Sequence, residues 1–276
     1  MTDNKLDLIL KGINQINDKL DSLNTKEIKE SLDELHSLIS KRDHLISDDI
    51  CKLIDSKINN NITQIESLMA IYNFLPDVKF LPSSRGWAGS PDFLLKILEI
   101  IFKKKPNIIV ELGSGLSTII IGSALKKLNK GCLFSLDHEE GFLNNTRENA
   151  DFNNISEFVN LNYTPLIEYD NNYKWYDINK VNIQSKIDIL IVDGPPRIIQ
   201  QNARYPALPL LLDKLSDDSI IILDDANRTD EKTIIDLWSK YLNNNCIEYM
   251  KEDFEYFDKG LTIFYINKIK QLLSFG

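Results

Sequence analysis

The chain has 276 residues, 43% of them hydrophobic and 26% charged, and carries a formal net charge of −9. This length and composition predict a soluble protein with one sizeable α/β domain and an additional element, and no stretch approaches the roughly 20 apolar residues of a membrane span. The acidic balance disfavours nucleic acid as a partner, because a negatively charged surface repels a phosphate backbone.

Residues 1–75 are predicted to form an α-helical, coiled-coil-like arm, with one glycine, Gly12, and no proline before Pro76. Apolar residues recur there at alternating steps of three and four, which favours a homo-oligomer formed through the arm. Two amphipathic helices packed on the next domain are the alternative. Polar residues at Arg42 and Asp49 argue against one unbroken helix. The apolar stripe comprises Leu6, Ile9, Ile13, Ile16, Leu20, Leu23, Ile28, Leu32, Leu35, Ile39, Ile46, Leu53, Ile58, Ile62, Ile65 and Met69.

Residues 76–276 are predicted to form a second domain, in which strands and helices alternate as in a doubly wound, mostly parallel α/β sheet. Two later strands around the turn Asp258-Lys259-Gly260 predict a closing antiparallel hairpin. The expected strands are Ile108–Leu112, Cys132–Leu136, Phe158–Leu161, Ile187–Val192, Ser219–Leu223, Cys246–Tyr256 and Leu261–Ile266. The expected helices are Pro91–Lys104, Ser117–Leu128, Gly141–Phe152, Asn202–Leu215 and Asp230–Tyr241.

A glycine turn follows the first of these strands, in the segment Glu111-Leu112-Gly113-Ser114-Gly115. Glycines let the backbone approach a ligand closely, and the free N–H groups at the start of the next helix attract a carboxylate or a phosphate. The turn therefore predicts a cofactor pocket, and a plain strand-to-helix connection is the alternative.

Acidic residues end three of the predicted strands. Asp137 follows the second strand, about 20 positions after the glycine turn, where a carboxylate can accept hydrogen bonds from ribose hydroxyls. Asp193 ends the fourth strand, and Asp224 and Asp225 end the fifth. Because ligands of open parallel sheets bind at the carboxyl ends of the strands, we expect these carboxylates to converge near the glycine turn.

These motifs together resemble those of class I S-adenosylmethionine-dependent methyltransferases, over roughly residues 80 to 267. The resemblance rests on Glu-Leu-Gly-Ser-Gly-x-Ser-Thr from residue 111, Ser-Leu-Asp-His from 135, Val-Asp-Gly-Pro-Pro from 192 and Leu-Asp-Asp from 223. It extends to O-methyltransferases associated with glycans and secondary metabolites, and to the catechol-type enzymes. The resemblance implies O-methylation of a small molecule or a sugar hydroxyl.

The resemblance also implies roles for individual residues. Asp137 would face the ribose of the methyl donor, and Asp193 would lie beneath the reacting sulfur. From its position after Asp137, His138 is a candidate to line the adenine pocket or to act as a base, and a polar surface histidine is the favoured alternative. Glu111, Gly113, Ser114 and Gly115 would face the methionine part of S-adenosylmethionine. Ser117 and Thr118, in the following turn, are also predicted to bind the cofactor.

Two mechanisms stay open at this point. In the catechol-type enzymes an aspartate and an Asp-Asn pair hold magnesium, whereas this chain has Asp193 with the pair Asp224-Asp225 and no evident lysine base. Either Mg²⁺ is held by these three carboxylates, or the enzyme works without metal and uses Asp193, Asp225 or His138 as the base.

Aromatic and arginine side chains are expected at the rim of the same site, where they suit a polar acceptor. Pairing of Arg204 and Arg228 with the aspartates is the alternative for those two. The candidate acceptor residues are Arg85, Trp87, Trp175, Tyr176, Arg197, Arg204, Tyr205 and Arg228.

Two rival functions are a nicotinamide-dependent oxidoreductase, which the glycine turn and Asp137 also suit, and a methyltransferase-like scaffold without activity. Thr118 stands where a dinucleotide fingerprint has its third glycine, which disfavours the first. Cys51, Cys132 and Cys246 form no CxxC pattern and indicate reduced thiols. With no visible signal peptide, the expected location is the cytoplasm.

Overall fold

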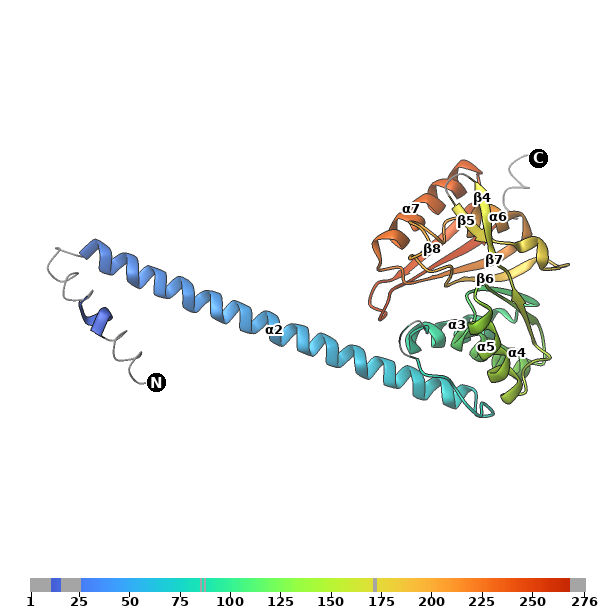
Figure 1. Cartoon of the computed structure of the whole chain (residues 1–276), viewed down its shortest axis with the longest axis horizontal. Helices are drawn as coiled ribbons and strands as arrows, with labels where there is room; N and C mark the ends of the chain where they lie inside the picture. The colour runs from blue at the N-terminus through green and yellow to red at the C-terminus, as the bar shows by residue number, and fades with distance from the viewer. Residues whose placement is uncertain (1–10, 16–25, 85, 87, 171–172, 269–276) are drawn as a thin grey trace. The chain divides into compact units, whose positions relative to one another are not determined.

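The computed structural model describes residues 11–15, 26–84, 86, 88–170 and 173–268. Tertiary contacts divide the chain into two units, Met1–Asn59 and Asn60–Gly276. The boundary between these units lies within the long helix α2 (Lys26–Phe74; Figure 1). The sequence predicted a domain boundary after residue 75, where this helix ends. None of the described helices is both long and apolar enough to cross a membrane.

Helix α2 continues without a break through Arg42 and Asp49, where the sequence suggested interruptions. Arginine has a high helix propensity and aspartate costs only a few tenths of a kcal/mol, so neither residue ends a helix. The last turns of α2 belong to the second unit, where Ser67 and Ile71 are buried and Ile71 is part of a hydrophobic core. On the other side of the same turns, Ile65 and Met69 are exposed.

A seven-stranded sheet forms the centre of the second unit, in the order β3-β2-β1-β6-β7-β9-β8. The first five strands of this order are parallel, and β9 runs antiparallel to both β7 and β8. The predicted doubly wound sheet with a closing hairpin is therefore confirmed. The strands are β1 (Ile108–Leu112), β2 (Cys132–Asp137), β3 (Val159–Tyr163), β6 (Ile187–Val192), β7 (Leu215–Asp224), β8 (Glu248–Phe254) and β9 (Leu261–Asn267).

Helices cover both faces of the sheet, which is why the central strands carry apolar runs such as Ile189–Val192 of β6. In β6, Ile189 and Ile191 face one hydrophobic core while Leu190 and Val192 face the other, as the two-residue period of a strand requires. The helices α3 (Pro91–Lys104), α4 (Leu116–Leu128) and α5 (Glu140–Phe152) lie on one side, and α6 (Ala207–Leu211) and α7 (Thr229–Asn244) on the other (Figure 1).

Two regions differ from the sequence prediction. A small antiparallel sheet, β4 (Leu166–Asp170) with β5 (Tyr173–Tyr176), was not predicted and lies between β3 and β6 in the chain. The helix expected at 202–215 is reduced to α6 and the 3₁₀ turn Leu212–Lys214, with turns before it. Pro206 and Pro209 explain the short helix, because proline removes a backbone donor and is tolerated only in a first turn.

Candidate active site

The glycine turn joins β1 to α4 at the carboxyl edge of the sheet. Gly113 has φ 101°, a conformation that favours glycine, and a Cβ there would lie 3.4 Å from the backbone of Asp193. A Cβ on Gly115 would meet no atom within 4 Å, so the space above this residue is open. The turn thus leaves room for a ligand at the start of α4.

Glu111, at the end of β1, is fully buried behind the turn. Its Oε2 accepts hydrogen bonds from Thr118 Oγ1 at 2.5 Å and Ser135 Oγ at 2.6 Å, and Thr118 Oγ1 in turn accepts from Gly115 N at 2.9 Å. Ser117 is also buried in this first turn of α4. Burial raises the pKa of Glu111 to about 7. Glu111 Oε1 has no hydrogen-bond partner within the described part of the chain.

Asp137, at the end of β2, braces the glycine turn from the other side. Its Oδ2 accepts hydrogen bonds from the backbone N and the Oγ of Ser114, at 2.9 and 2.7 Å, and its Oδ1 accepts from Glu139 N at 3.0 Å. His138 is half-buried, with Nδ1 3.6 Å from Asp137 Oδ1 and the ring edge-on to Tyr176. Asp137 and His138 therefore border the space beside the turn.

The strand-end carboxylates of Asp193, Asp224 and Asp225 come together as the topology requires. One carboxylate oxygen of each lies within 4.8 Å of the other two. Asp224 and Asp225 are buried, and Asp193 keeps a small exposed surface. Asp225 has φ 61°, a left-handed conformation that aspartate tolerates better than most residues.

Arg204 lies in the middle of these carboxylates, with its side chain only 4% exposed. Its Nη2 donates to Asp225 Oδ2 at 2.8 Å and to Asp193 Oδ1 at 3.2 Å. The same guanidinium donates to the backbone oxygens of Asp193 at 2.8 Å and Asp224 at 2.9 Å, and lies 3.8 Å from Glu231 Oε1. Arg228 Nη1 lies 2.7 Å from Asp225 Oδ2.

Burial and repulsion within this cluster oppose ionisation of its acids. Burial, and then the neighbouring Asp193 and Asp225, raise the pKa of Asp224 well above its ordinary value. Burial also raises the pKa of Asp193, against the charge of Arg204. We expect the smaller rise at Asp193, because this side chain is partly exposed.

The other predicted acceptor residues are scattered. Trp175 and Tyr176, on β5, are buried, and the Tyr176 hydroxyl has no partner among the described side chains and lies beside Gly194. Tyr205 is half-buried, with its ring against that of Tyr173. Arg197 points to Asp230 at 3.5 Å, with 64% of its side chain exposed. Arg85 and Trp87 lie outside the described residues.

Lys259 is a site residue that the sequence analysis did not identify. It lies in the turn between β8 and β9, and its Nζ donates to the backbone oxygens of Ala88 at 2.7 Å and Gly86 at 3.3 Å. Its charge lowers the pKa of Asp193. The turn was visible in the sequence, but its closeness to β6 depends on the sheet order, for which the sequence carries no local signal.

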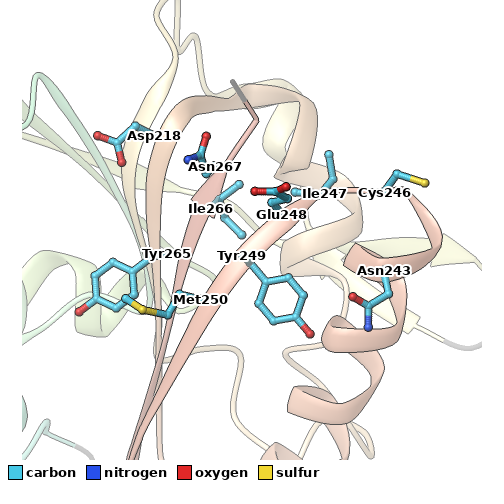
Figure 2. A pocket seen from close by; sticks show the side chains of 10 residues that line it. All are labelled: Asp218, Asn243, Cys246, Ile247, Glu248, Tyr249, Met250, Tyr265, Ile266 and Asn267. Carbon is cyan, nitrogen blue, oxygen red and sulfur yellow. The ribbon is translucent and has the colours of Figure 1, made fainter. Parts of the chain in front are cut away.

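A hollow of about 650 Å³ lies away from these residues (Figure 2). It borders the ends of β7 and β9 where Asp218 pairs with Asn267, opposite the end that carries Asp224. None of the strand-end carboxylates lines this hollow. We therefore place the candidate site by its chemistry, at the carboxyl edge of the sheet.

Comparisons with known proteins agree with this geometry. Residues 110–226 match the family model of a methyltransferase domain. A methyltransferase from Podospora anserina, bound to S-adenosylhomocysteine, shares 14% identity with a TM-score of 0.52, over 73% of this chain and 88% of that one. An O-methyltransferase from Bacillus cereus, in complex with S-adenosylhomocysteine, shares 13% identity with a TM-score of 0.51, over 74% and 90%. No curated protein sequence matches the chain.

At these identities the structural likenesses establish the fold, and the domain match establishes the kind of domain that carries the glycine turn and the strand-end carboxylates. Residues 110–226 therefore match a methyltransferase domain, and the second unit has the Rossmann-like fold of the two methyltransferases named above, as the sequence motifs predicted.

The raised pKa of Glu111 predicts a pH-dependent stability in the absence of ligand. The folded state holds the Glu111 proton more tightly than the unfolded state does. The resulting contribution to the free energy of unfolding is fully present below the ordinary pKa of 4.5 and is lost as the pH rises through about 7. The loss amounts to about 3 kcal/mol. Urea denaturation of Glu111→Gln and the wild type, at about pH 5 and about pH 8, should show the variant gaining relative stability at the higher pH.

Glu148→Gln is the control, because Glu148 is exposed on α5. A stability difference between wild type and Glu111→Gln that stays constant across this pH range would contradict the raised pKa.

Proposed function

We propose that this protein binds S-adenosylmethionine at the glycine turn and methylates an oxygen of a small-molecule or glycan acceptor. The observation that carries the proposal is the turn itself, which places open space above Gly115 at the start of α4, where helix N–H groups are free. The two related structures named above contain S-adenosylhomocysteine, the product of the same donor.

The residues around the turn fit the donor chemically. A carboxylate is suited to the free N–H groups at the start of α4, beside the open space above Gly115. Glu111 lies behind the turn and would face the methionine part of the donor. An ionised carboxylate can accept about four hydrogen bonds, and Asp137 accepts three from the protein. About one position is therefore left for a ribose hydroxyl. His138 would border the nucleoside, and Gly113 and Ser114 the methionine part.

The chemistry needs a proton acceptor and an aligned oxygen. S-adenosylmethionine supplies a methyl group on an activated sulfonium, so the acceptor oxygen–methyl bond forms as the sulfur–methyl bond breaks. The acceptor hydroxyl proton moves to a carboxylate, for which Asp193 is the best placed of the three. It has the most exposed side chain of the cluster, whereas Asp225 is held by both Arg204 and Arg228.

We assign no step to Mg²⁺. Asp193 Oδ1 and Asp225 Oδ2 are hydrogen-bonded to Arg204, which leaves this cluster fewer oxygen ligands than Mg²⁺ requires, so the residues present do not fit the metal expected for catechol-type enzymes.

We also propose that α2 joins two copies of the chain. Ile58, Ile62, Ile65 and Met69 follow steps of four, three and four, and all four are about half exposed. The packed face of these turns, with Ile71, lies on the opposite side, so packing within the chain leaves the apolar stripe free. A seam of this spacing is complementary to a second helix of the same kind.

Donor binding has a direct test. Gly115→Ala places a methyl group in the open space above the turn, without meeting protein atoms. We expect the variant to fold normally and to bind S-adenosylmethionine at least about tenfold more weakly in isothermal titration, because the backbone no longer approaches the ligand. Gly141→Ala, also at an open position, is the matched control and should bind as the wild type does. Failure of the wild type to bind either S-adenosylmethionine or S-adenosylhomocysteine would sink the proposal.

The role of Asp193 predicts a separation of binding from turnover. Asp193→Asn keeps the backbone oxygen that binds Arg204 but cannot accept the acceptor proton. We expect kcat to fall by about 100-fold or more, with donor affinity unchanged, in a labelled-methyl assay over a panel of hydroxyl acceptors. Near wild-type turnover in this variant would remove Asp193 as the base and leave His138 and Asp225.

Self-association through α2 can be tested by introducing a single charged residue into the apolar stripe. Ile65→Glu should shift the full-length chain toward monomer in light scattering, because a carboxylate in an apolar seam is costly to bury. Ser56→Glu, at an exposed position away from the stripe, should leave the mass unchanged. A wild-type chain that is monomeric at all accessible concentrations would contradict this part of the proposal.

A further inference from the structure

We propose that Arg204 takes the place of the divalent cation in this site, so that its carboxylates are neutralised from within the chain and methyl transfer needs no metal. The inference rests on the proposed function for the reaction that it describes. Its central claim, that the cluster does not take up a divalent ion, can be measured without donor or acceptor.

The position of the guanidinium is the first argument. Arg204 Nη2 lies between Asp193 Oδ1 and Asp225 Oδ2, at 3.2 and 2.8 Å, so these two oxygens already share a cationic group. Mg²⁺ demands about six oxygen ligands at about 2.0–2.1 Å in nearly octahedral geometry. The same carboxylate oxygens cannot provide that geometry while they accept these hydrogen bonds.

The backbone contacts of Arg204 are the second argument. Nη1 donates to the main-chain oxygen of Asp224 and Nη2 to that of Asp193, so the guanidinium is tied to the ends of both strands. These oxygens belong to the sheet and cannot turn away as side chains do. Arg204 is therefore anchored independently of the carboxylates that it neutralises.

The balance of charge is the third argument. Four acids face this cluster, namely Asp193, Asp224, Asp225 and Glu231, and they are opposed by Arg204 and Arg228, with Lys259 acting on Asp193. Two guanidiniums and an ammonium offset most of this negative charge. A divalent ion would add two positive charges to a cluster that is already nearly balanced.

One observation points the other way and has to be weighed. Asp224 Oδ1 and Asp225 Oδ1 have no hydrogen-bond partner in the described residues, and unpaired carboxylate oxygens are what a cation seeks. Both atoms are, however, shielded from solvent. Mg²⁺ gives up its water reluctantly and usually keeps several water ligands, so two enclosed oxygens offer it a poor site. We therefore give more weight to the occupied oxygens than to the unpaired ones.

The experiment is a titration of the full-length protein with Mn²⁺, followed by electron paramagnetic resonance, with no methyl donor present. We expect no stoichiometric binding by the wild type up to about 1 mM Mn²⁺. Arg204→Met removes the guanidinium while keeping a long side chain, and should bind one Mn²⁺ per chain at least about tenfold more tightly. Arg197→Met removes an exposed arginine outside the cluster and should behave as the wild type does.

Two results would overturn the inference. One is stoichiometric Mn²⁺ binding by the wild type that is lost in Asp224→Asn, which would show a working metal site beside Arg204. The other is a folded Arg204→Met chain that gains no Mn²⁺ binding. If Arg204→Met does not fold, as judged by circular dichroism, the wild type and Asp224→Asn still decide the question. Isothermal titration with S-adenosylmethionine is a separate measurement, so loss of the proposed function would be recognised independently.

Discussion

The candidate site depends on a single guanidinium that joins the ends of two neighbouring strands. Parallel topology alone brings the carboxyl ends of β6 and β7 together, and with them Asp193, Asp224 and Asp225. Burial and mutual repulsion both disfavour such a group of acids. Arg204 relieves the repulsion and also holds the backbone of both strands. The acidic floor of the site is therefore part of the structure of the sheet rather than an addition to it.

The neighbouring glycine turn is organised by the same means, with neutral donors in place of a guanidinium. Thr118 and Ser135 donate to Glu111, and Ser114 donates to Asp137, so each strand-end acid also fixes the loop beside it. Most of the polar groups of the turn are thus satisfied before any ligand binds. A pocket of this kind loses little conformational freedom on binding, which favours affinity.

The sequence predicts the sheet well, because alternating strands and helices permit few arrangements. It predicts β4 and β5 poorly, since Tyr173–Tyr176 is only four residues long. The helix expected at 202–215 was too long, because Pro206 and Pro209 confine it to α6. Strand-end aspartates could be placed from topology. The central position of Arg204 could not, because an arginine 11 residues after Asp193 can reach the rim or the floor equally well. Lys259 was missed for a similar reason, since only the completed sheet brings the hairpin turn beside β6.

The left-handed backbone at Asp225 has a consequence for how such enzymes change over time. Asparagine adopts this conformation as readily as aspartate does, so an Asp-Asn pair would fit the same backbone without rearrangement. Loss of the arginine at position 204, together with that exchange, would expose the same strand ends to a divalent ion. If methyl transfer here needs no metal, as proposed, two side chains on one backbone would separate it from a metal-dependent reaction. A lineage with this fold would then have a short evolutionary path between the two.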